Sequence, residues 1–579
     1  MSLLAVFVVV AAVLLIAYRL YGRVLSRLAR LDPDRATPAT ELRDDSDYIP
    51  TETKFLIGQH FSAIAAAGPI VGPILAGMYF GWGPAILWIV LGAILIGGVH
   101  DFMALVASIR HKARSIAEVV RDHMGRPSYL LFLSFIWFAL VYIIVAFTDI
   151  TAAAFVGTQT LENGQSVKGP GIATSSMLYL AIPILMGLLL RFTKLGLGWA
   201  TVIFLPLVGL AVVGGQHIPM DLAAWFGVSD QAAHRMWDVV ILAYCVAAAM
   251  IPMWLLLQPR GHLGGYFLYA SLAAAGIGVI FAGRTVEFPA FLGWEHAKGG
   301  PLFPILFITI ACGACSGFHA LIASGTTSKQ LKRETDARLV GYGTMLMEAM
   351  VAVIALSCVM MFAQGSSTLA QGKPNFIYAA GMGAYLQPLG IAPAIAVAFA
   401  LMAFTTFVYD TLDVCTRLGR YIIQELTGWK GRFGAFVATT ATAGVPLAFL
   451  IGTPLDPTGT APPAWQKFWA LFGASNQLLA ALTLLGITVW LWRTRRAIWV
   501  WLVTGLPTVW MYGMSVWALG LTLQREAADP TKPAWTLNPV VWIGGVLLVL
   551  AGLMAIAAIA AFFKAPGAPT PEPAPAAGS

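Results

Sequence analysis

Five acidic or imidazole side chains stand inside or at the edge of long apolar runs, where ordinary hydration is lost. They belong to His100, Asp101, Asp149, Glu348 and Asp410. A charge in hydrocarbon costs several kcal/mol unless it is paired, neutralised or hydrated, so such residues commonly mark proton relays or ion pathways. The chemistry that this pattern predicts is reversible proton binding.

Glu348 is the strongest of these candidates. It lies about seven residues, or roughly 10 Å, inside a predicted span at 341–363 that contains no Lys or Arg. Burial favours the neutral acid, so Glu348 could hold a proton in one state of the protein and release it in another. The alternative is a neutral acid that hydrogen-bonds to a neighbouring helix.

The remaining acids each have a structural alternative. Asp149 lies near the outer end of its span and could equally be solvated. His100 and Asp101 are followed within a few turns by three basic residues, so a cytoplasmic ion pair competes with a gate or proton relay. Asp410 ends a span predicted at 391–411 and remains a proton-binding candidate.

A salt bridge is predicted just beyond Asp410. Asp413 and Arg417 are four residues apart, which is the spacing of neighbours on one face of a helix. We place this pair in a cytoplasmic stretch that begins at residue 412, and we give it a structural role.

Backbone rather than side chains is the predicted ligand in a second region. The pairs Gly68-Pro69 and Gly72-Pro73 interrupt the apolar run 61–80, and a proline removes a backbone donor from a helix. Unwound backbone at membrane depth is tolerated where it is buried in protein or lines a cavity, so we predict half of a substrate or ion site at Gly68, Pro69 and Gly72. The alternative is a packing kink.

Two further segments carry the same kind of prediction. Pro252 falls in the middle of a predicted span at 237–257, where it predicts a second broken helix. The predicted span 302–323 is crowded with small residues and leads into Ser316, His319 and Ser324, which could bind substrate or, at the two serines, a sodium ion. Helix packing, with the hydroxyls bonded to the preceding turn, is the alternative.

Composition fixes the elements that must position these residues. With 59% hydrophobic and 11% charged residues, the chain is predicted to be an all-α polytopic membrane protein. Apolar length predicts fifteen transmembrane helices, at about 2–18, 61–80, 83–106, 129–155, 174–190, 196–214, 237–257, 264–283, 302–323, 341–363, 391–411, 433–451, 468–491, 498–521 and 539–563.

Basic residues predict the orientation. Of the 35 Lys and Arg residues, 27 fall in one alternating set of loops, which the positive-inside rule assigns to the cytoplasm. The N-terminus is then periplasmic and the C-terminus cytoplasmic. Residues 1–60 form an anchor helix and cytoplasmic linker, and residues 564–579 form a disordered Pro/Ala tail.

Counting spans predicts an internal repeat. Five helices run from 61 to 215 and five from 237 to 411, each set begins with a span that contains a proline, and an odd number per set reverses the second set. This is the layout of an inverted-repeat transporter core. Residues 412–563 then supply the cytoplasmic connection and four C-terminal helices.

The motifs together resemble a known family. Segments at 67–73, 97–119, 251–260, 311–331, 410–426 and 472–485 look like those of the carbon starvation protein family of bacterial membrane transporters. The resemblance covers residues from about 55 to 520. It implies a LeuT-like core distantly related to the amino acid/polyamine/organocation superfamily, and a secondary transporter of the bacterial inner membrane that imports peptides or pyruvate during carbon starvation.

The resemblance also implies partners and coupling. It implies a small-molecule substrate, the lipid bilayer, no nucleic acid, no cofactor, and H⁺ as coupling ion with Na⁺ as the alternative. Two positions depart from the family pattern: Gly261-His262 stands where an Asp-Tyr pair is common, and Asp410 where threonine is frequent. Either difference could alter coupling or gating.

Two other classes of function stay open. A membrane nutrient sensor would use the same pocket, although the sequence offers only a short tail as an output segment. An intramembrane enzyme would need a nucleophile beside a base, and Cys315 with His319, four residues apart, is the one faint match. Cys312 and Cys315 otherwise appear as small neighbours on one helix face. We therefore predict that the protein is not an enzyme.

Overall fold

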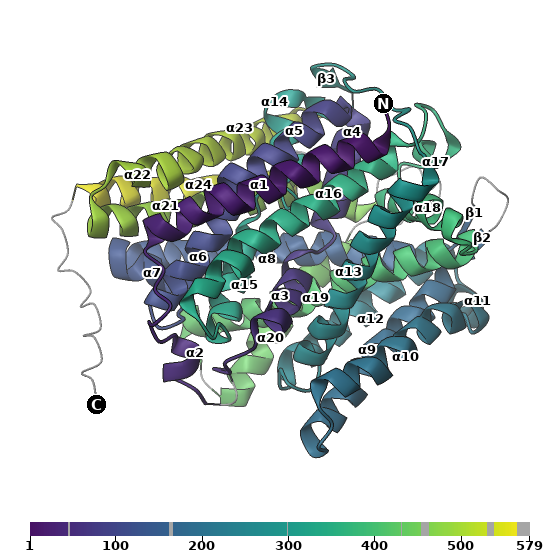
Figure 1. Ribbon diagram of the computed structural model, residues 1–579, viewed down its shortest axis with the longest axis horizontal. Helices are drawn as coiled ribbons and strands as arrows, with labels where there is room; N and C mark the ends of the chain where they lie inside the picture. Colours follow the sequence, from purple (N-terminus) through teal and green to yellow (C-terminus); the bar gives the residue numbers. More distant parts are fainter. Residues whose placement is uncertain are drawn as a thin grey trace.

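The computed structural model describes residues 1–44, 47–160, 166–297, 299–429, 431–452, 463–529 and 538–563, so the predicted tail at 564–579 lies outside the described residues. Helices dominate it (Figure 1). The first half of the chain holds α1 (Leu3–Ala29), α2 (Pro38–Glu41), α3 (Thr53–Ile64), α4 (Gly68–Phe80), α5 (Trp82–Gly92), α6 (Gly98–Arg110), α7 (Ile116–Met124), α8 (Arg126–Ala154), α9 (Gly169–Phe192), α10 (Leu197–His217), α11 (Leu222–Phe226), α12 (Asp230–Met250) and α13 (Leu257–Ala282).

The second half contains helices of very unequal length. They are α14 (Leu302–Thr309), α15 (Gly317–Gly325), α16 (Thr344–Met360), α17 (Ser367–Ala370), α18 (Pro374–Leu386), α19 (Pro393–Thr427), α20 (Gly431–Gly452), α21 (Ala464–Arg495), α22 (Ile498–Val500), α23 (Leu506–Ala528) and α24 (Pro539–Phe562). The longest, α19, has 35 residues.

Short elements complete the chain. The 3₁₀ turns are η2 (Thr327–Lys329), η3 (Glu334–Asp336) and η5 (Gln387–Leu389), and the π turns are η1 (Ala93–Gly97), η4 (Arg338–Gly343) and η6 (Trp501–Gly505). Two antiparallel hairpins pair β1 (Thr158–Thr160) with β2 (Ser166–Lys168), and β3 (Glu295–His296) with β4 (Gly300–Pro301).

The all-α membrane fold predicted from composition is confirmed. In the described residues, thirteen helices are long and apolar enough to cross a membrane, or up to fourteen if the bent pair α3 and α4 counts as one span. The most enclosed spans are those that include α16, α19 and α21, whereas only about a third or fewer of the residues in α1, α10 and α24 are buried. Exposed apolar side chains suit helices that face lipid, so α16, α19 and α21 form the core.

The first predicted broken helix is present, with a shifted break. Helix α3 begins at Thr53, earlier than predicted, and meets α4 at a bend of 49° over residues 65–67. Helix α4 then continues from Gly68 through Pro73 without interruption. Gly68-Pro69 therefore starts the second half of the span, where a proline at the first positions of a helix removes no needed hydrogen bond, whereas Pro73 lies inside α4.

The span predicted at 302–323 is wrong as a continuous helix. Helix α14 ends at Thr309, α15 begins at Gly317, and residues 310–316 between them are not helical. The two breaks contact each other: a Cβ at Gly68 would lie 2.3 Å from Sγ of Cys312, and one at Gly72 would lie 2.4 Å from the carbonyl oxygen of Thr309. Glycine is therefore required for this close approach.

The predicted mid-membrane break at Pro252 is also wrong. Helix α12 ends at Met250, α13 begins at Leu257, and Pro252 lies in the connection between these two spans. Proline ends a helix as readily as it breaks one, because it lacks the N–H that the next turn would need. The broken partner of α3 and α4 is α14 with α15, and the five-plus-five division based on Pro252 stays a prediction.

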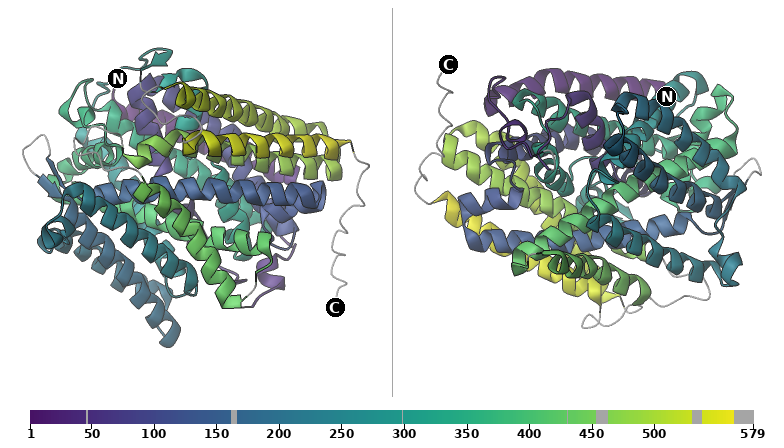
Figure 2. Two further views of the ribbon diagram at one scale, coloured as in Figure 1. Left: turned by 180° about the vertical axis from the view of Figure 1, so that it is seen from behind. Right: turned by 90° about the horizontal axis from the view of Figure 1, so that it is seen from below.

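Helix α19 continues through residue 412 to Thr427, so the cytoplasmic connection predicted from residue 412 would begin inside a helix, and its cytoplasmic position stays a prediction. Figure 1 shows the long helices running roughly parallel, with α2 and α7 at one end of the molecule and β1, β2 and α11 at the other. Seen from behind, α24 runs beside α8 (Figure 2). Segments α2 and α7 belong to the two loops richest in Lys and Arg.

Two of the π turns touch each other beside the core. Tyr342 of η4 donates its hydroxyl hydrogen bond to the carbonyl oxygen of Ile94 in η1, at 3.3 Å. A Cβ at Gly98 would lie 2.5 Å from the ring of Tyr342, and one at Gly341 would lie 2.9 Å from Cα of Phe102. Helices α6 and α16, which follow these turns, are thereby held close together.

Candidate functional site: two buried charge clusters

An imidazole and carboxylate chain lies at the centre of the described structure. We call His100, Asp101, His319 and Glu348 the imidazole cluster. Nδ1 of His319 donates to Oδ2 of Asp101 at 2.7 Å, and Nδ1 of His100 donates to Oδ1 of the same carboxylate, also at 2.7 Å. All four side chains are fully buried. Each carboxylate oxygen of Asp101 thus accepts one hydrogen bond from an imidazole, one from α6 and one from α15.

Glu348 completes the chain from α16. Its Oε2 lies 3.2 Å from Nε2 of His319, but the two groups are not aligned as a hydrogen bond, and Oε1 has no hydrogen-bond partner. Because Nδ1 of His319 already carries the proton shared with Asp101, one further proton can sit either on Nε2 or on Glu348. A bare carboxylate would be costly here, so the gap between the two groups is suited to binding and passing a proton.

The break before α15 is what aims His319 into this cluster. Asn476 of α21 accepts the backbone N–H of Phe318 at 3.0 Å through Oδ1, and its Nδ2 donates to Oγ of Ser316 at 3.0 Å. The N–H of Phe318 belongs to the first turn of α15, where backbone donors have no partner within the helix, and Asn476 supplies one. Nδ2 also lies 3.3 Å from Sγ of Cys312. Asn476 therefore fixes the start of α15 from outside that helix.

A second cluster is built on a permanent charge. Arg260 in the first turns of α13 is fully buried, and its Nε donates to Oδ1 of Asp410 at 2.6 Å. Its Nη1 contacts both Asp413 and the hydroxyl of Tyr244. Ser62 of α3 donates to the other oxygen of Asp410 at 2.5 Å. We call Arg260, Asp410 and Asp413 the guanidinium cluster.

The predicted pair of Asp413 with Arg417 is wrong. Asp413 contacts Arg260 and accepts a hydrogen bond from Tyr244 at 2.8 Å. Arg417 instead donates to the carbonyl oxygens of Ala248 and Ile251, at 2.7 and 2.8 Å. It thereby caps the end of α12, where carbonyls lack helical partners.

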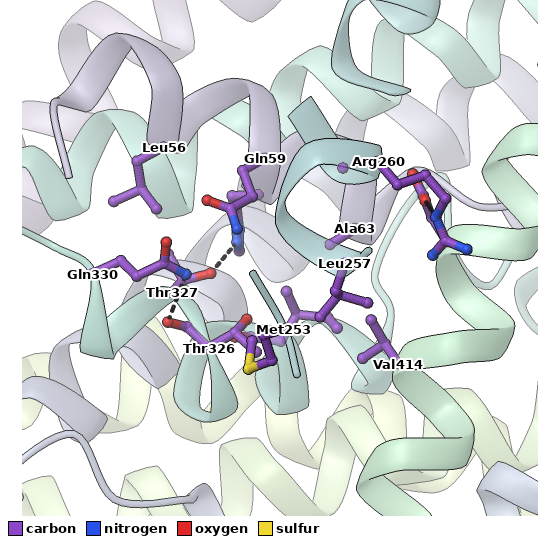
Figure 3. Close-up of a pocket in the computed structure, with 14 residues that line it drawn as sticks. Leu56, Gln59, Ala63, Met253, Leu257, Arg260, Thr326, Thr327, Gln330 and Val414 are labelled. Atoms are coloured by element: carbon purple, nitrogen blue, oxygen red, sulfur yellow. Dashed lines mark hydrogen bonds and ion pairs between the residues drawn. The ribbon is translucent and has the colours of Figure 1, made fainter. Parts of the chain in front are cut away.

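A narrow cavity lies beside the guanidinium cluster, and Arg260 and Asp410 form part of its wall. Figure 3 shows Leu56 and Gln59 of α3 on one side, Thr326, Thr327 and Gln330 on a second, and Met253, Leu257 and Arg260 on a third. The other lining residues are His60, Ala63, Gly261, Ile322, Asp410 and Val414. The cavity volume is about 30 Å³, which is room for roughly two waters.

Two polar nitrogens of the cavity wall lack partners. Nδ1 of His60 forms a hydrogen bond with Oγ1 of Thr327 at 2.7 Å, while Nε2 of His60 has no hydrogen-bond partner. Nη2 of Arg260 has none either. A buried donor without a partner costs free energy that a bound molecule can recover.

The predicted site residues divide between these places. His100, Asp101, His319 and Glu348 come together, and the alternative pairing of Asp101 with the basic residues after it is wrong because Arg110 contacts Glu334 instead. Asp410 lies at the cavity. The substrate-binding residues predicted from the sequence are absent from the fourteen described residues that line it. Their direct contact with a substrate stays a prediction.

The remaining predictions lie apart from both clusters. Oδ2 of Asp149 accepts the N–H of Trp465 at 2.7 Å, and Oδ1 lies 3.1 Å from Nε2 of His234, so Asp149 is neither solvated nor joined to Glu348. Ser316 bonds to Asn476, and Ser324 donates to the carbonyl of Ala320 at 2.6 Å. The two serines stand eight residues apart, roughly 12 Å along α15, so one sodium ion would reach only one of them.

Sequence reasoning missed Arg260, His60 and Asn476. Arg260 was assigned to a loop because the apolar run appears to begin after it, and His60 fell just before the predicted start of its span. Asn476 offered a usable signal, since an amide inside the apolar run 468–491 needs a partner there.

A separate pair of histidines lies outside the membrane-spanning helices. Nε2 of His111 and Nε2 of His123 in α7 are 3.0 Å apart, and Nδ1 of His111 donates to the carbonyl of Ala107 at 2.7 Å. Burial lowers the pKa of His111 below its ordinary value, and burial lowers the pKa of His123 to about 4. Both rings are therefore neutral at neutral pH.

Comparison with known families identifies relatives along most of the chain. The family model "Carbon starvation protein CstA" matches residues 2–370 and 362–518. The peptide transporter CstA of Mycobacterium tuberculosis is 33% identical, over 92% of this chain and 77% of that protein. The pyruvate/proton symporter BtsT of Escherichia coli is 31% identical, over 90% of this chain and 82% of that protein.

Solved structures are more distant. A manganese transporter of Eremococcus coleocola aligns with 90% of this chain and 99% of its own at 14% identity, with a TM-score of 0.47. MhsT in complex with L-phenylalanine aligns with 89% of this chain and 98% of its own, also at 14% identity, with a TM-score of 0.42.

Proposed function

This chain belongs to the carbon starvation protein CstA family, and on that basis we propose that it is a proton-coupled secondary transporter that imports small peptides or a pyruvate-like carboxylate. It is a multi-pass membrane protein, and we propose the bacterial inner membrane as its location. The observation that carries the proposal is the imidazole cluster, in which His319 stands between Asp101 and Glu348 with a place for one proton.

In this proposal the imidazole cluster couples proton binding to movement of the broken helices. His319 lies on α15 directly after the break, whereas Glu348 lies on α16. When the shared proton is present, His319 and Glu348 attract each other and hold α15 against α16. When it leaves, the repulsion between Glu348 and Asp101 is no longer balanced, which favours separation.

We propose that the substrate binds beside Arg260, in a conformation that widens this cavity beyond its present room for roughly two waters. The guanidinium cluster holds one cation and two carboxylates, so a substrate anion is repelled while both acids are ionised. Protonation of Asp410 or Asp413 would make the cluster neutral and leave Nη2 of Arg260 free for a substrate carboxylate. Peptides and pyruvate both carry that group.

Uptake by the purified protein in proteoliposomes tests the function. Labelled pyruvate and, separately, a labelled dipeptide are offered with and without an imposed inward proton gradient. We expect one of them to accumulate above its external concentration only with the gradient. Accumulation driven by a sodium gradient instead would change the coupling ion, and accumulation of neither compound under either gradient would refute the proposal.

The orientation can be tested by cysteine labelling, because the five native cysteines are all buried. We expect an impermeant reagent to reach cysteines placed at Lys168 or Lys373 from outside the cell, but not one placed at Lys332. The opposite pattern would place the N-terminus in the cytoplasm.

A further inference from the structure

We propose that Asp149, His234 and Asp238 form a binding site for one divalent transition-metal ion at the end of the molecule near β1, β2 and α11. The three side chains, which we call the outer triad, offer two carboxylates and one imidazole. These are ligand types that zinc and similar ions accept in proteins. This inference does not depend on the proposed transport function.

The geometry of the triad comes from two packed helices. His234 and Asp238 are four residues apart on α12 and therefore face the same way, while Asp149 faces them from α8. One ligand atom of each residue lies within 4.8 Å of the others. Ligands about 2.1 Å from a shared ion stand roughly 3.4 Å apart in a tetrahedron, so closure needs small side-chain movements.

An unpartnered carboxylate oxygen is the independent sign that a ligand belongs here. Oδ1 of Asp238 has no hydrogen-bond partner, although Asp238 is only 2% exposed. Asp149, in contrast, is satisfied by the Trp465 N–H and by His234. The triad thus holds one more carboxylate than His234 can pair, and a buried carboxylate without a partner is costly.

The charge and access of the site suit a metal ion. Two carboxylates balance the charge of a divalent cation when the imidazole is neutral, and the ring that binds through Nε2 keeps its proton on Nδ1. A cavity of about 310 Å³ is lined by Ala233 and Trp237, the sequence neighbours of the two α12 ligands, although the triad itself does not line it. The cavity wall holds two acids, Asp221 and Asp230, against one base, Lys168, so its net charge favours cations.

Binding of Zn²⁺ to the full-length protein in detergent tests the proposal. After removal of metals, isothermal titration at neutral pH should give one Zn²⁺ per chain and a higher melting temperature for the bound protein. We expect Asp238→Asn and His234→Gln each to weaken binding by at least about 100-fold, since even supporting groups around metal ligands contribute 10- to 100-fold. His217→Gln, at an exposed histidine in the last turn of α10, should bind as the parent does.

The melting temperature without metal separates loss of a ligand from loss of the fold. Asp238→Asn removes a buried charge that has no partner, so the metal-free variant should melt at the parent's temperature or higher while losing its response to Zn²⁺. The proposal is overturned if the parent binds no Zn²⁺ in a saturable manner, or if both triad variants bind it as tightly as His217→Gln does.

Discussion

The imidazole cluster and the guanidinium cluster each place a central base between two carboxylates, but the two bases differ in kind. In both, two carboxylates surround one central base: Asp101 and Glu348 around His319, and Asp410 and Asp413 around Arg260. Arginine stays charged at any physiological pH, whereas histidine gains and loses its proton near neutrality. The base of the guanidinium cluster therefore keeps its charge and ties α13 to α19, whereas the base of the imidazole cluster can itself gain or lose a proton.

Their hydrogen bonding differs in the same sense. The acids of the guanidinium cluster also accept from Ser62 and Tyr244, while Glu348 has no hydrogen-bond partner in the described residues. The guanidinium cluster still has two unpartnered atoms, Nη2 of Arg260 and Oδ1 of Asp413. Both of its acids nevertheless accept at least one hydrogen bond, whereas Glu348 accepts none from the described residues and gains most from a proton. Three substitutions and one change of pH should show which residues stabilise the fold and which couple proton binding to transport.

The largest effect is expected from Glu348→Gln, which fixes the neutral form and keeps the size of the side chain. Accumulation driven by a proton gradient should be abolished, while exchange of labelled for unlabelled substrate across the membrane continues. Proteoliposome assays measure both. Glu287→Gln, at an exposed loop residue, is the matched control and should retain accumulation.

Normal accumulation by Glu348→Gln would assign this carboxyl a structural role and direct attention to Asp410. If the variant neither accumulates nor exchanges substrate, its size-exclusion elution profile shows whether it is folded. If it is well folded, the side chain is needed for substrate movement as well as for coupling.

Arg260→Gln should instead damage the fold. Removing one partner of a buried ion pair leaves uncompensated charge and typically costs about 3–5 kcal/mol, here with two carboxylates left behind. We expect little folded protein on size-exclusion chromatography and a much lower melting temperature. Arg284→Gln, at an exposed arginine, should melt as the parent does.

A partial rescue would sharpen this result. Arg260→Lys keeps the charge but not the forked geometry, so it should restore some stability and less than the parent has. Full stability of Arg260→Gln would mean that the guanidinium cluster does not hold α13 to α19.

Gly72→Ala should have a smaller effect, through the contact between the two broken helices. The added methyl group would meet the carbonyl oxygen of Thr309 at 2.4 Å, and backbone cannot move aside as a side chain can. Overpacking of this kind costs about 1–3 kcal/mol. Gly276→Ala on α13 has nothing within 4 Å of the new atom and should not lower the melting temperature, because alanine favours a helix more than glycine does. Equal melting temperatures for the two variants would contradict the close contact.

The smallest effect is expected from acid on the pair His111 and His123, which has no carboxylate between its rings. The ordinary pKa of 6.5 is lowered in the folded protein, to about 4 for His123, so the unfolded chain binds more protons between these values. The stabilising contribution of the pair is therefore complete above pH 6.5 and is lost as the pH falls towards 4.

Melting curves between pH 7.5 and 5 measure this loss. His123→Gln should flatten the decline relative to the parent, because it cannot be protonated, whereas His217→Gln should follow the parent. An identical decline for all three proteins would exclude the pair as its cause.

The sequence predicted most spans well, because apolar length sets them. It also predicted that Glu348 lies inside a span, and Glu348 is fully buried, while its proton-coupling role stays a prediction. It could not predict the break at 310–316, where small residues such as Gly313 are compatible with a helix. That break depends on Asn476, which is distant in the sequence and reaches Ser316 and Phe318 only in the folded protein.

The error at Pro252 has a different physical reason. A proline indicates that helical hydrogen bonding stops, and it does so equally at mid-membrane and at a helix end. Likewise, the spacing of Asp413 and Arg417 allowed a salt bridge but could not exclude a stronger partner on another helix. Arg260 is that partner, brought to Asp413 by the packing of α13 on α19.

The π turns η1 and η4 precede the two helices that carry Asp101 and Glu348, so a change in either turn would move one acid of the imidazole cluster by a fixed step. Each π turn accommodates one residue more than an α-helical turn, so converting it to α-helix would rotate everything beyond it by about 100° and shift it by about 1.5 Å. Asp101 follows η1 and Glu348 follows η4. Because Tyr342 ties the two turns together, a change of register in one helix would expose the Ile94 carbonyl in the other. Asp101 and Glu348 are therefore linked through the contact between the two turns as well as through His319.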